Sequence, residues 1–233
     1  MIPAHFLGPR TVPFREKKIS QEHAMLIPWS GPPTMTPPIF LALYIAGFLL
    51  AASIRLWYTQ EYRRKIKEEH WRPALDTWLI YLPALGMFIL PGIYILTPYL
   101  APADYTLPES AGWVGAGIFG AALLLLWRSH ADLGANFTPN ADVQQGQRLV
   151  TTGVYQHIRH PMYASHFLWS IAQPFLLWNW IAGFGLLITF IPLYVVRVPV
   201  EEKMLAGKFG AAYEQYMERT GRIIPRFGRS GTR

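Results

Sequence analysis

Residues 161–196 form an uninterrupted stretch of 36 residues without Asp, Glu, Lys or Arg. As one α-helix this stretch would be about 54 Å long at about 1.5 Å per residue, whereas the hydrocarbon core of a bilayer is about 30 Å thick. It is therefore predicted to form two membrane-spanning helices. We place the hinge at Trp178-Asn179-Trp180, where a polar turn residue lies between two indoles of the kind that settle among lipid headgroups.

Three further apolar stretches are close to the length of a membrane span. They cover residues 37–57, with one charge at Arg55, residues 75–100, with one at Asp76, and residues 111–127, with none. Charged residues make up only 15% of the chain, against roughly 25% in soluble domains. The predicted fold class is all-α: a polytopic membrane protein with five transmembrane helices at about 37–57, 75–100, 111–128, 161–178 and 180–197, a folded cytoplasmic loop and a C-terminal amphipathic helix.

The ends of the chain differ from this apolar centre. Residues 1–35 contain no long apolar run and are predicted to be a polar N-terminal tail, while residues 36–233 are predicted to form a single membrane-embedded domain. After the fifth apolar stretch, large side chains recur at helical spacing, which predicts the amphipathic helix. These side chains are Leu205, Phe209, Tyr213 and Tyr216.

The basic residues predict the orientation. Five spans place 17 of the 21 Lys and Arg residues on one face, together with the C-terminus and the long connection before residue 161. Cytoplasmic segments carry such an excess, so we expect an integral, multi-pass membrane protein whose C-terminus and long connection are cytoplasmic. The net charge of +7 is then a topology signal and an attraction to anionic membrane lipid, not a nucleic-acid footprint. The absence of Cys excludes thiol chemistry.

The long connection and the C-terminal part carry an ordered series of motifs. Leu-Val-x-x-Gly-x-Tyr at residues 149–155 precedes Arg-His-Pro-x-Tyr at residues 159–163. Two apolar stretches then lead to Arg197 and to Glu201-Glu202, and the series ends with Phe-Gly-x-x-Tyr-x-x-Tyr and Arg-x-x-Pro. In this order the motifs resemble the isoprenylcysteine carboxyl methyltransferases, over about residues 133–227.

The resemblance implies an integral-membrane enzyme that uses S-adenosylmethionine to methylate a lipophilic or prenylated acceptor. It places the catalytic region at about 133–163 and 197–227, with Arg197 on the substrate and Glu201 on the cofactor. Position by position, it assigns cofactor binding to Gln147, Arg148, Leu149, Val150, Tyr155, His160, Pro161, Met162, Tyr163 and Glu201. The eukaryotic enzymes tend to have His where Gln147 stands, which favours a backbone contact there.

The chemistry of the residues is consistent with this resemblance. An acceptor carboxylate is already ionised at pH 7, so its methylation requires no general base. It requires a countercharge at the membrane edge, which the guanidinium of Arg197 can supply. Glu201 lies one helical turn after Arg197, so it could pair with the amino group of the cofactor or with Arg197 itself.

Several alternatives remain open from the sequence. The acceptor could be a phospholipid or another lipid, because the wider group includes phospholipid methyltransferases. A membrane reductase that uses NADPH and a non-catalytic lipid-binding protein are less favoured readings. Metal binding is not expected, because no carboxylate or thiol joins His157, His160 and His166. The Gly-x-Gly-x-x-Gly pattern at residues 115–120 follows no strand, so it predicts close helix packing, not nucleotide binding.

Overall fold

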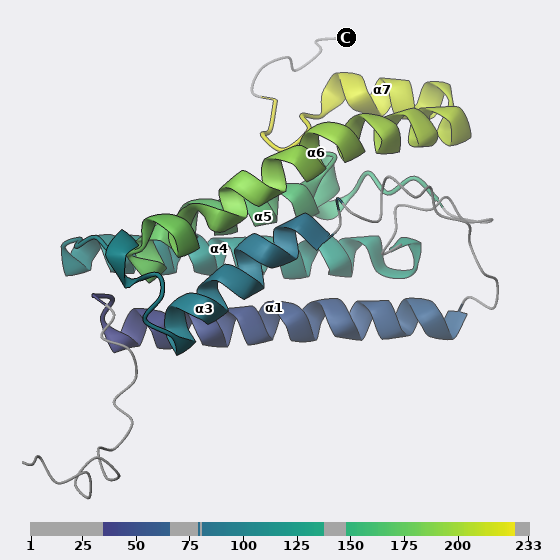
Figure 1. Cartoon of the computed structure of the whole chain (residues 1–233). Coiled ribbons are helices and arrows are strands. Elements are labelled where there is room, and N and C mark those ends of the chain that lie inside the picture. Colours follow the sequence, from purple (N-terminus) through teal and green to yellow (C-terminus); the bar gives the residue numbers. More distant parts are fainter. Residues whose placement is uncertain (1–34, 66–78, 80, 138–147, 227–233) are drawn as a thin grey trace, which may run out of the picture. The chain divides into compact units, whose positions relative to one another are not determined.

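The computed structural model describes residues 35–65, 79, 81–137 and 148–226. Its principal helices, in chain order, are α1 (Pro38–Lys65), α3 (Leu90–Leu96), α4 (Glu109–Leu133), α5 (Pro161–Leu177), α6 (Trp180–Phe209) and α7 (Ala211–Arg219) (Figure 1). A π-helix, η2 (Leu85–Ile89), leads into α3, and short 3₁₀ turns are η3 (Ala101–Ala103), η4 (Gly134–Asn136) and η5 (Gly153–Gln156). The residues beyond Ser30 form one compact unit, Gly31–Arg233, and the other unit, Met1–Ser30, lies outside the described residues.

Within the described residues, three helices are long and apolar enough to cross a membrane: residues 38–62, 109–136 and 180–209. They correspond to the first, third and fifth predicted spans. The helical segment at residues 81–96 is shorter, and α5 has 17 residues. The structure is therefore helical and has three candidate membrane helices, while the second and fourth predicted spans stay predictions.

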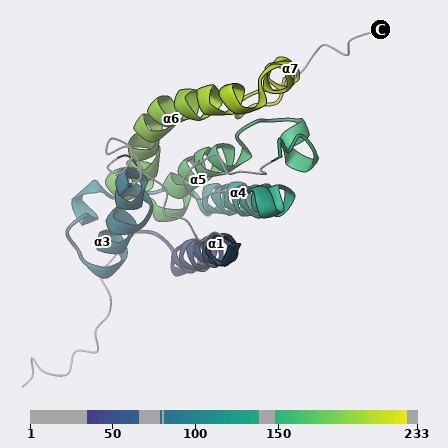
Figure 2. The ribbon, with the colours of Figure 1, turned by 90° about the vertical axis from the view of Figure 1, so that its right-hand side faces the viewer.

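The long helices pack in sequence, with α4 against α1 and α5, and α5 against α6 (Figure 2). Small residues permit the closest approach, since a Cβ added at Gly115 of α4 would lie 2.4 Å from the Cβ of Phe175 in α5. A Cβ at Gly117 or Gly120 would meet nothing within 4 Å. Close packing was predicted for this glycine pattern, and it is found at its first glycine only.

Side chains from other helices donate to two carbonyls in the turn before Pro91. Proline has no N–H, so this turn is short of one backbone donor. The Tyr44 hydroxyl donates to the Met87 carbonyl at 2.8 Å, and Gln173 Nε2 donates to the Gly86 carbonyl at 2.9 Å. Because an unpaired carbonyl is costly in lipid, these bonds let η2 and α3 lie within the apolar bundle.

The turn between α5 and α6 confirms the predicted hinge. Asn179 accepts hydrogen bonds from the N–H groups of Ile181 and Ala182, which makes it the N-cap of α6. Its Nδ2 donates at 2.7 Å to Asp104 in the preceding connection. Trp180 is exposed, as expected for a headgroup residue, whereas Trp178 is buried against Phe40. The prediction of two interfacial indoles is therefore wrong for Trp178.

The helix predicted after residue 197 is divided between two elements. α6 continues to Phe209 and ends at Gly210, whose φ of 53° favours glycine. The chain then starts α7, where Tyr213 and Tyr216 are buried. A single amphipathic helix is therefore not what the structure shows, because the left-handed glycine turns the chain in the middle of the pattern.

Candidate functional site

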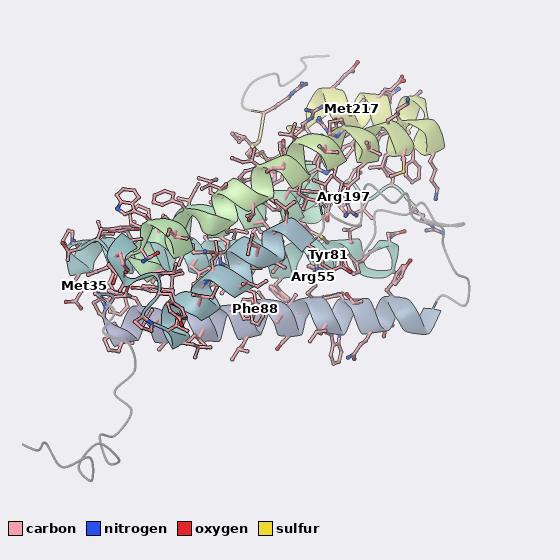
Figure 3. The ribbon with its side chains drawn as sticks, viewed as in Figure 1. Met35, Arg55, Tyr81, Phe88, Arg197 and Met217 are labelled. Atoms are coloured by element: carbon pink, nitrogen blue, oxygen red, sulfur yellow. The ribbon has the colours of Figure 1, made fainter. Side chains whose placement is uncertain are left out.

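The candidate site lies where the N-terminus of α5 meets α6 (Figure 3). Pro161 is the first residue of α5, a position where its missing N–H leaves no bond unmade. His160 therefore stands directly before the helix, and Tyr163 stands in its first turn. Arg197 and Glu201 come from α6, one turn apart on the same face.

Glu201 joins the two helices. Its Oε1 accepts hydrogen bonds from Nε of Arg197 at 2.7 Å and from the hydroxyl of Tyr163 at 2.6 Å. Its other oxygen, Oε2, lies 3.8 Å from Nδ1 of His160. Four residues assigned from the motifs, His160, Tyr163, Arg197 and Glu201, are therefore in one contact group.

The neighbouring residue Glu202 is the centre of a second cluster. Its Oε1 accepts hydrogen bonds from Nε and Nη2 of Arg159 at 3.1 and 3.0 Å, and its Oε2 accepts from Nε and Nη2 of Arg222 at 3.0 and 2.7 Å. Nε2 of His160 lies 3.4 Å from Oε1. The side chains of Arg159 and Glu202 are 7% and 9% exposed, so this is a nearly buried ion pair. The hydrogen bond to Glu202 raises the pKa of Arg222.

Backbone bonds hold the loop before α5 to the segment after α7. The N–H of Arg159 donates to the carbonyl of Gly221, and the N–H of His160 donates to the carbonyl of Arg222, both at 2.8 Å. Arg159 Nη1 also donates to the carbonyls of Met217 and Thr220. Arg159 thus links α6, α7 and the loop, and it fixes the backbone at the entrance to α5.

The remaining predicted cofactor residues lie in the loop. Gln147 is outside the described residues. Arg148 is exposed, and its N–H donates to Oδ1 of Asn136 at 2.8 Å. Leu149, Val150 and Met162 are half-buried.

Tyr155 is buried in η5, and its hydroxyl donates to the carbonyl of Ser129 in α4 at 3.3 Å. Burial raises the pKa of this hydroxyl well above its usual range. The backbone carbonyl of Tyr155 accepts a hydrogen bond from the Tyr216 hydroxyl at 2.6 Å. These contacts show Tyr155 joining α4, the loop and α7, so a role toward a cofactor stays a prediction.

Sequence reasoning missed the roles of Arg159 and Glu202. Both residues stand inside the motifs that carry the resemblance, next to His160 and Glu201. The available signal was their sequence position next to His160 and Glu201. Adjacent residues on a helix point about 100° apart, so this position does not show which partner each side chain meets. Among the described residues, no cluster of three or more His, Asp and Glu side chains is arranged to hold a metal ion.

Comparisons with known proteins single out the same part of the chain. Residues 113–207 match the model of the isoprenylcysteine carboxyl methyltransferase family. Protein-S-isoprenylcysteine O-methyltransferase B of Arabidopsis thaliana is 33% identical over 82 residues, which are 35% of this chain and 42% of that protein. The protein-S-isoprenylcysteine O-methyltransferase of Dictyostelium discoideum is 34% identical over 122 residues, which are 50% of each protein.

A solved structure of a eukaryotic intramembrane Ras methyltransferase is 26% identical, with a TM-score of 0.44 over 65% of this chain and 50% of that one. The chain spans half or less of the length of the curated relatives named above. The matched segment contains His160, Tyr163, Arg197 and Glu201. The resemblance to the isoprenylcysteine carboxyl methyltransferase family is thereby confirmed over residues 113–207.

Proposed function

We propose that the protein is an integral-membrane methyltransferase that uses S-adenosylmethionine to methylate the carboxylate of a lipophilic acceptor, as in an isoprenylcysteine. The observation that carries the proposal is the contact group of Arg197, Glu201 and Tyr163 at the junction of α5 and α6. It combines a cation and an anion at the end of an apolar segment, inside the part of the chain that matches the family.

Arg197 is the residue proposed to bind the acceptor carboxylate. Its guanidinium carries five N–H donors, and its Nε bonds Glu201, which fixes the direction of the side chain. The residue is buried, so its charge acts in a medium of lower effective dielectric constant than water. Lysine would offer a point charge without the planar fork, so Arg197→Lys is expected to be poorly tolerated.

Glu201 is the residue proposed to bind the cofactor. S-adenosylmethionine carries an ammonium group and a sulfonium, and the carboxylate of Glu201 offers acceptor oxygens to such a cation while Tyr163 and Arg197 hold it in place. When bound, the cofactor supplies the electrophilic methyl group. His160, Pro161, Met162 and Tyr163, with the loop residues Gln147, Arg148, Leu149, Val150 and Tyr155, are the further proposed cofactor residues.

The chain's own contribution is positioning. A displacement at a methyl group needs the acceptor oxygen and the donor in line, and holding two reactants in that geometry supplies a large part of the rate. Arg159 and Glu202 support this role by fixing the loop and the end of α6. No residue has to remove a proton, because the acceptor is an anion at pH 7.

The proposed topology has five membrane helices, with the site on the cytoplasmic face. Its support is the position of the site residues along the helices. Arg197 lies 17 residues after the start of α6, which is about 25 Å along the helix axis, and His160 precedes the 17-residue helix α5. Both therefore lie close to one boundary of a core about 30 Å thick, on the face with the basic excess.

The proposal is tested with the purified chain in lipid vesicles. Methyl groups from isotope-labelled S-adenosylmethionine should be incorporated into S-farnesyl-cysteine and released by mild base, as expected for an ester. Arg197→Ala should lower the rate about 100-fold or more, because an anion at a buried site would lose its countercharge. The matched control is Lys203→Gln, an exposed cation on the same helix. Wild-type protein that binds neither S-adenosylmethionine nor its demethylated product would refute the proposal.

A further inference from the structure

Arg55 is a charged residue inside the first membrane helix, and it lies outside the segment that matches the family. It is the one Asp, Glu, Lys or Arg between residues 37 and 57. α1 continues for ten residues beyond it, to Lys65, so Arg55 is not at the end of its helix. An ionised side chain within a membrane helix is costly and marks a functional position by default.

The helical register directs Arg55 into the bundle. Tyr44 and Ala51 are buried, and Tyr58 contacts the ring of His130 with a centroid distance of 5.1 Å. At 100° per residue, positions 44, 51, 55 and 58 fall within a sector of about 60° on one face of α1. Arg55 therefore lies on the face that packs against the other helices, not on the face turned to lipid.

Side chains of the site lie within electrostatic range of Arg55. Its charge interacts with Arg197 of α6 and with Tyr163 of α5. It also acts on His130 of α4 and on His166 of α5. Figure 3 shows Arg55 on the side of α1 that is nearer to Arg197. Residues from four helices thus converge on the same region.

Arg55 is in none of the ion pairs that the described residues form around the site. In those pairs Glu201 holds Arg197, and Glu202 holds Arg159 and Arg222. Arg55 keeps accessible surface on this inner face of α1. Two nearby cations repel each other, and an anion bound between them offsets this repulsion. The arrangement is suited to a ligand that brings a carboxylate.

We propose that Arg55 is a second substrate-binding residue, which together with Arg197 binds the carboxylate of the lipophilic acceptor. The inference rests on the proposed function and adds α1 to the acceptor site. Both the acceptor and the cofactor carry a carboxylate. We assign Arg55 to the acceptor because it comes from an apolar membrane helix, whereas the proposed cofactor residues come from the loop and from the ends of α5 and α6.

The test compares Arg55→Gln and Arg55→Lys with wild type in lipid vesicles. For Arg55→Gln, the KM for S-farnesyl-cysteine should rise about 10-fold or more, because a charge-assisted hydrogen bond is lost. Arg55→Lys should recover part of this change. The affinity for S-adenosylhomocysteine, measured by calorimetry, should stay within about 2-fold. The matched control is Arg128→Gln, which changes a half-exposed arginine near the C-terminal end of α4. It should leave the KM and the affinity for S-adenosylhomocysteine unchanged.

A second measurement does not depend on turnover. Wild type should bind S-farnesyl-cysteine more tightly than its neutral carboxamide, and Arg55→Gln should reduce that preference about 10-fold. The thermal unfolding midpoint of each variant shows whether it is folded. A loss of S-adenosylhomocysteine affinity with unchanged KM would assign Arg55 to the cofactor and overturn the inference. An unchanged KM in active protein would overturn it as well, whereas inactive wild type would refute the proposed function itself.

Discussion

Glu201 and Glu202 are consecutive residues with different surroundings. Glu201 contacts side chains from the helices α5 and α6, and its side chain is 13% exposed. Glu202 contacts two arginines that arrive from the loop before α5 and from the segment after α7, and it is less exposed. Glu201 is the residue proposed to bind the cofactor, while Glu202 holds distant segments of the chain together. Adjacent acidic residues on one helix can thus divide binding and stability between them.

The largest expected effect is on stability and comes from Glu202. Arg159 is nearly buried, and Glu202→Ala removes its carboxylate partner. This loss is expected to lower the free energy of unfolding by about 3–5 kcal/mol. Denaturant unfolding in detergent micelles measures this change. Glu214→Ala, at an exposed position of α7, is the control and should cost about 0.5 kcal/mol or less. A loss for Glu202→Ala no greater than that of the control would show that the cluster does not hold the loop and tail.

Glu201 should show the opposite pattern. Glu201→Gln keeps the size of the side chain and removes its charge, so the affinity for S-adenosylhomocysteine should fall about 10- to 100-fold. Its unfolding free energy should change by less than that of Glu202→Ala, because glutamine keeps an acceptor oxygen for Arg197 and Tyr163. Calorimetry gives the affinity. An unchanged affinity, or a stability loss equal to that of Glu202→Ala, would erase the distinction between the two residues.

A change at Tyr163 tests the proposed cofactor role of Glu201 with a smaller expected effect. Its hydroxyl donates to Glu201 at 2.6 Å, and Tyr163→Phe removes this bond while keeping the ring contacts with Phe190 and Tyr194. One neutral donor to a charged group is expected to be worth about 1.5–3 kcal/mol at most, and we expect the lower end, because Arg197 still holds the carboxylate. A cofactor affinity about 10-fold lower, with the fold intact, is the expected result. If the affinity is unchanged, Glu201 does not need Tyr163 to be held in position.

The comparison also shows what the sequence could predict. The start of a helix at Pro161 and the hinge at Trp178-Asn179-Trp180 follow from local chemistry, and both are confirmed. The one-turn spacing of Arg197 and Glu201 predicted their possible contact. Which glutamate meets Arg159 could not be predicted, because it depends on the pairing of residues 157–160 with residues 221–222. That pairing joins segments about 60 residues apart and has no periodic signal.

Arg55 illustrates the same limit. In the sequence it stands out as the charge in an apolar stretch, which is equally consistent with a residue that reaches the membrane surface. Its register with Tyr44, Ala51 and Tyr58 shows an inward face only once the helix extends to Lys65 and the packing order of the helices is known. Helix packing in lipid lacks the strong hydrophobic bias that makes inside and outside readable in soluble proteins.

The smallest expected effect is that of pH on methyl transfer. The proposed acceptor carboxylate has a reference pKa near 3.5, so it is fully ionised from about pH 7 to pH 9, and arginine stays protonated throughout. The hydrogen bond from Tyr216 to the Tyr155 carbonyl also persists, because burial raises the pKa of Tyr216 to about 12. A raised tyrosine pKa adds stability that is complete below pH 10 and is lost only as the pH rises toward 12. The maximal rate should therefore change less than about 2-fold between pH 7 and pH 9. A rate that rises about 10-fold per pH unit would mean that the acceptor must lose a proton, as an amine or a phenol does, and Arg197 and Arg55 would then need a role other than binding an anion.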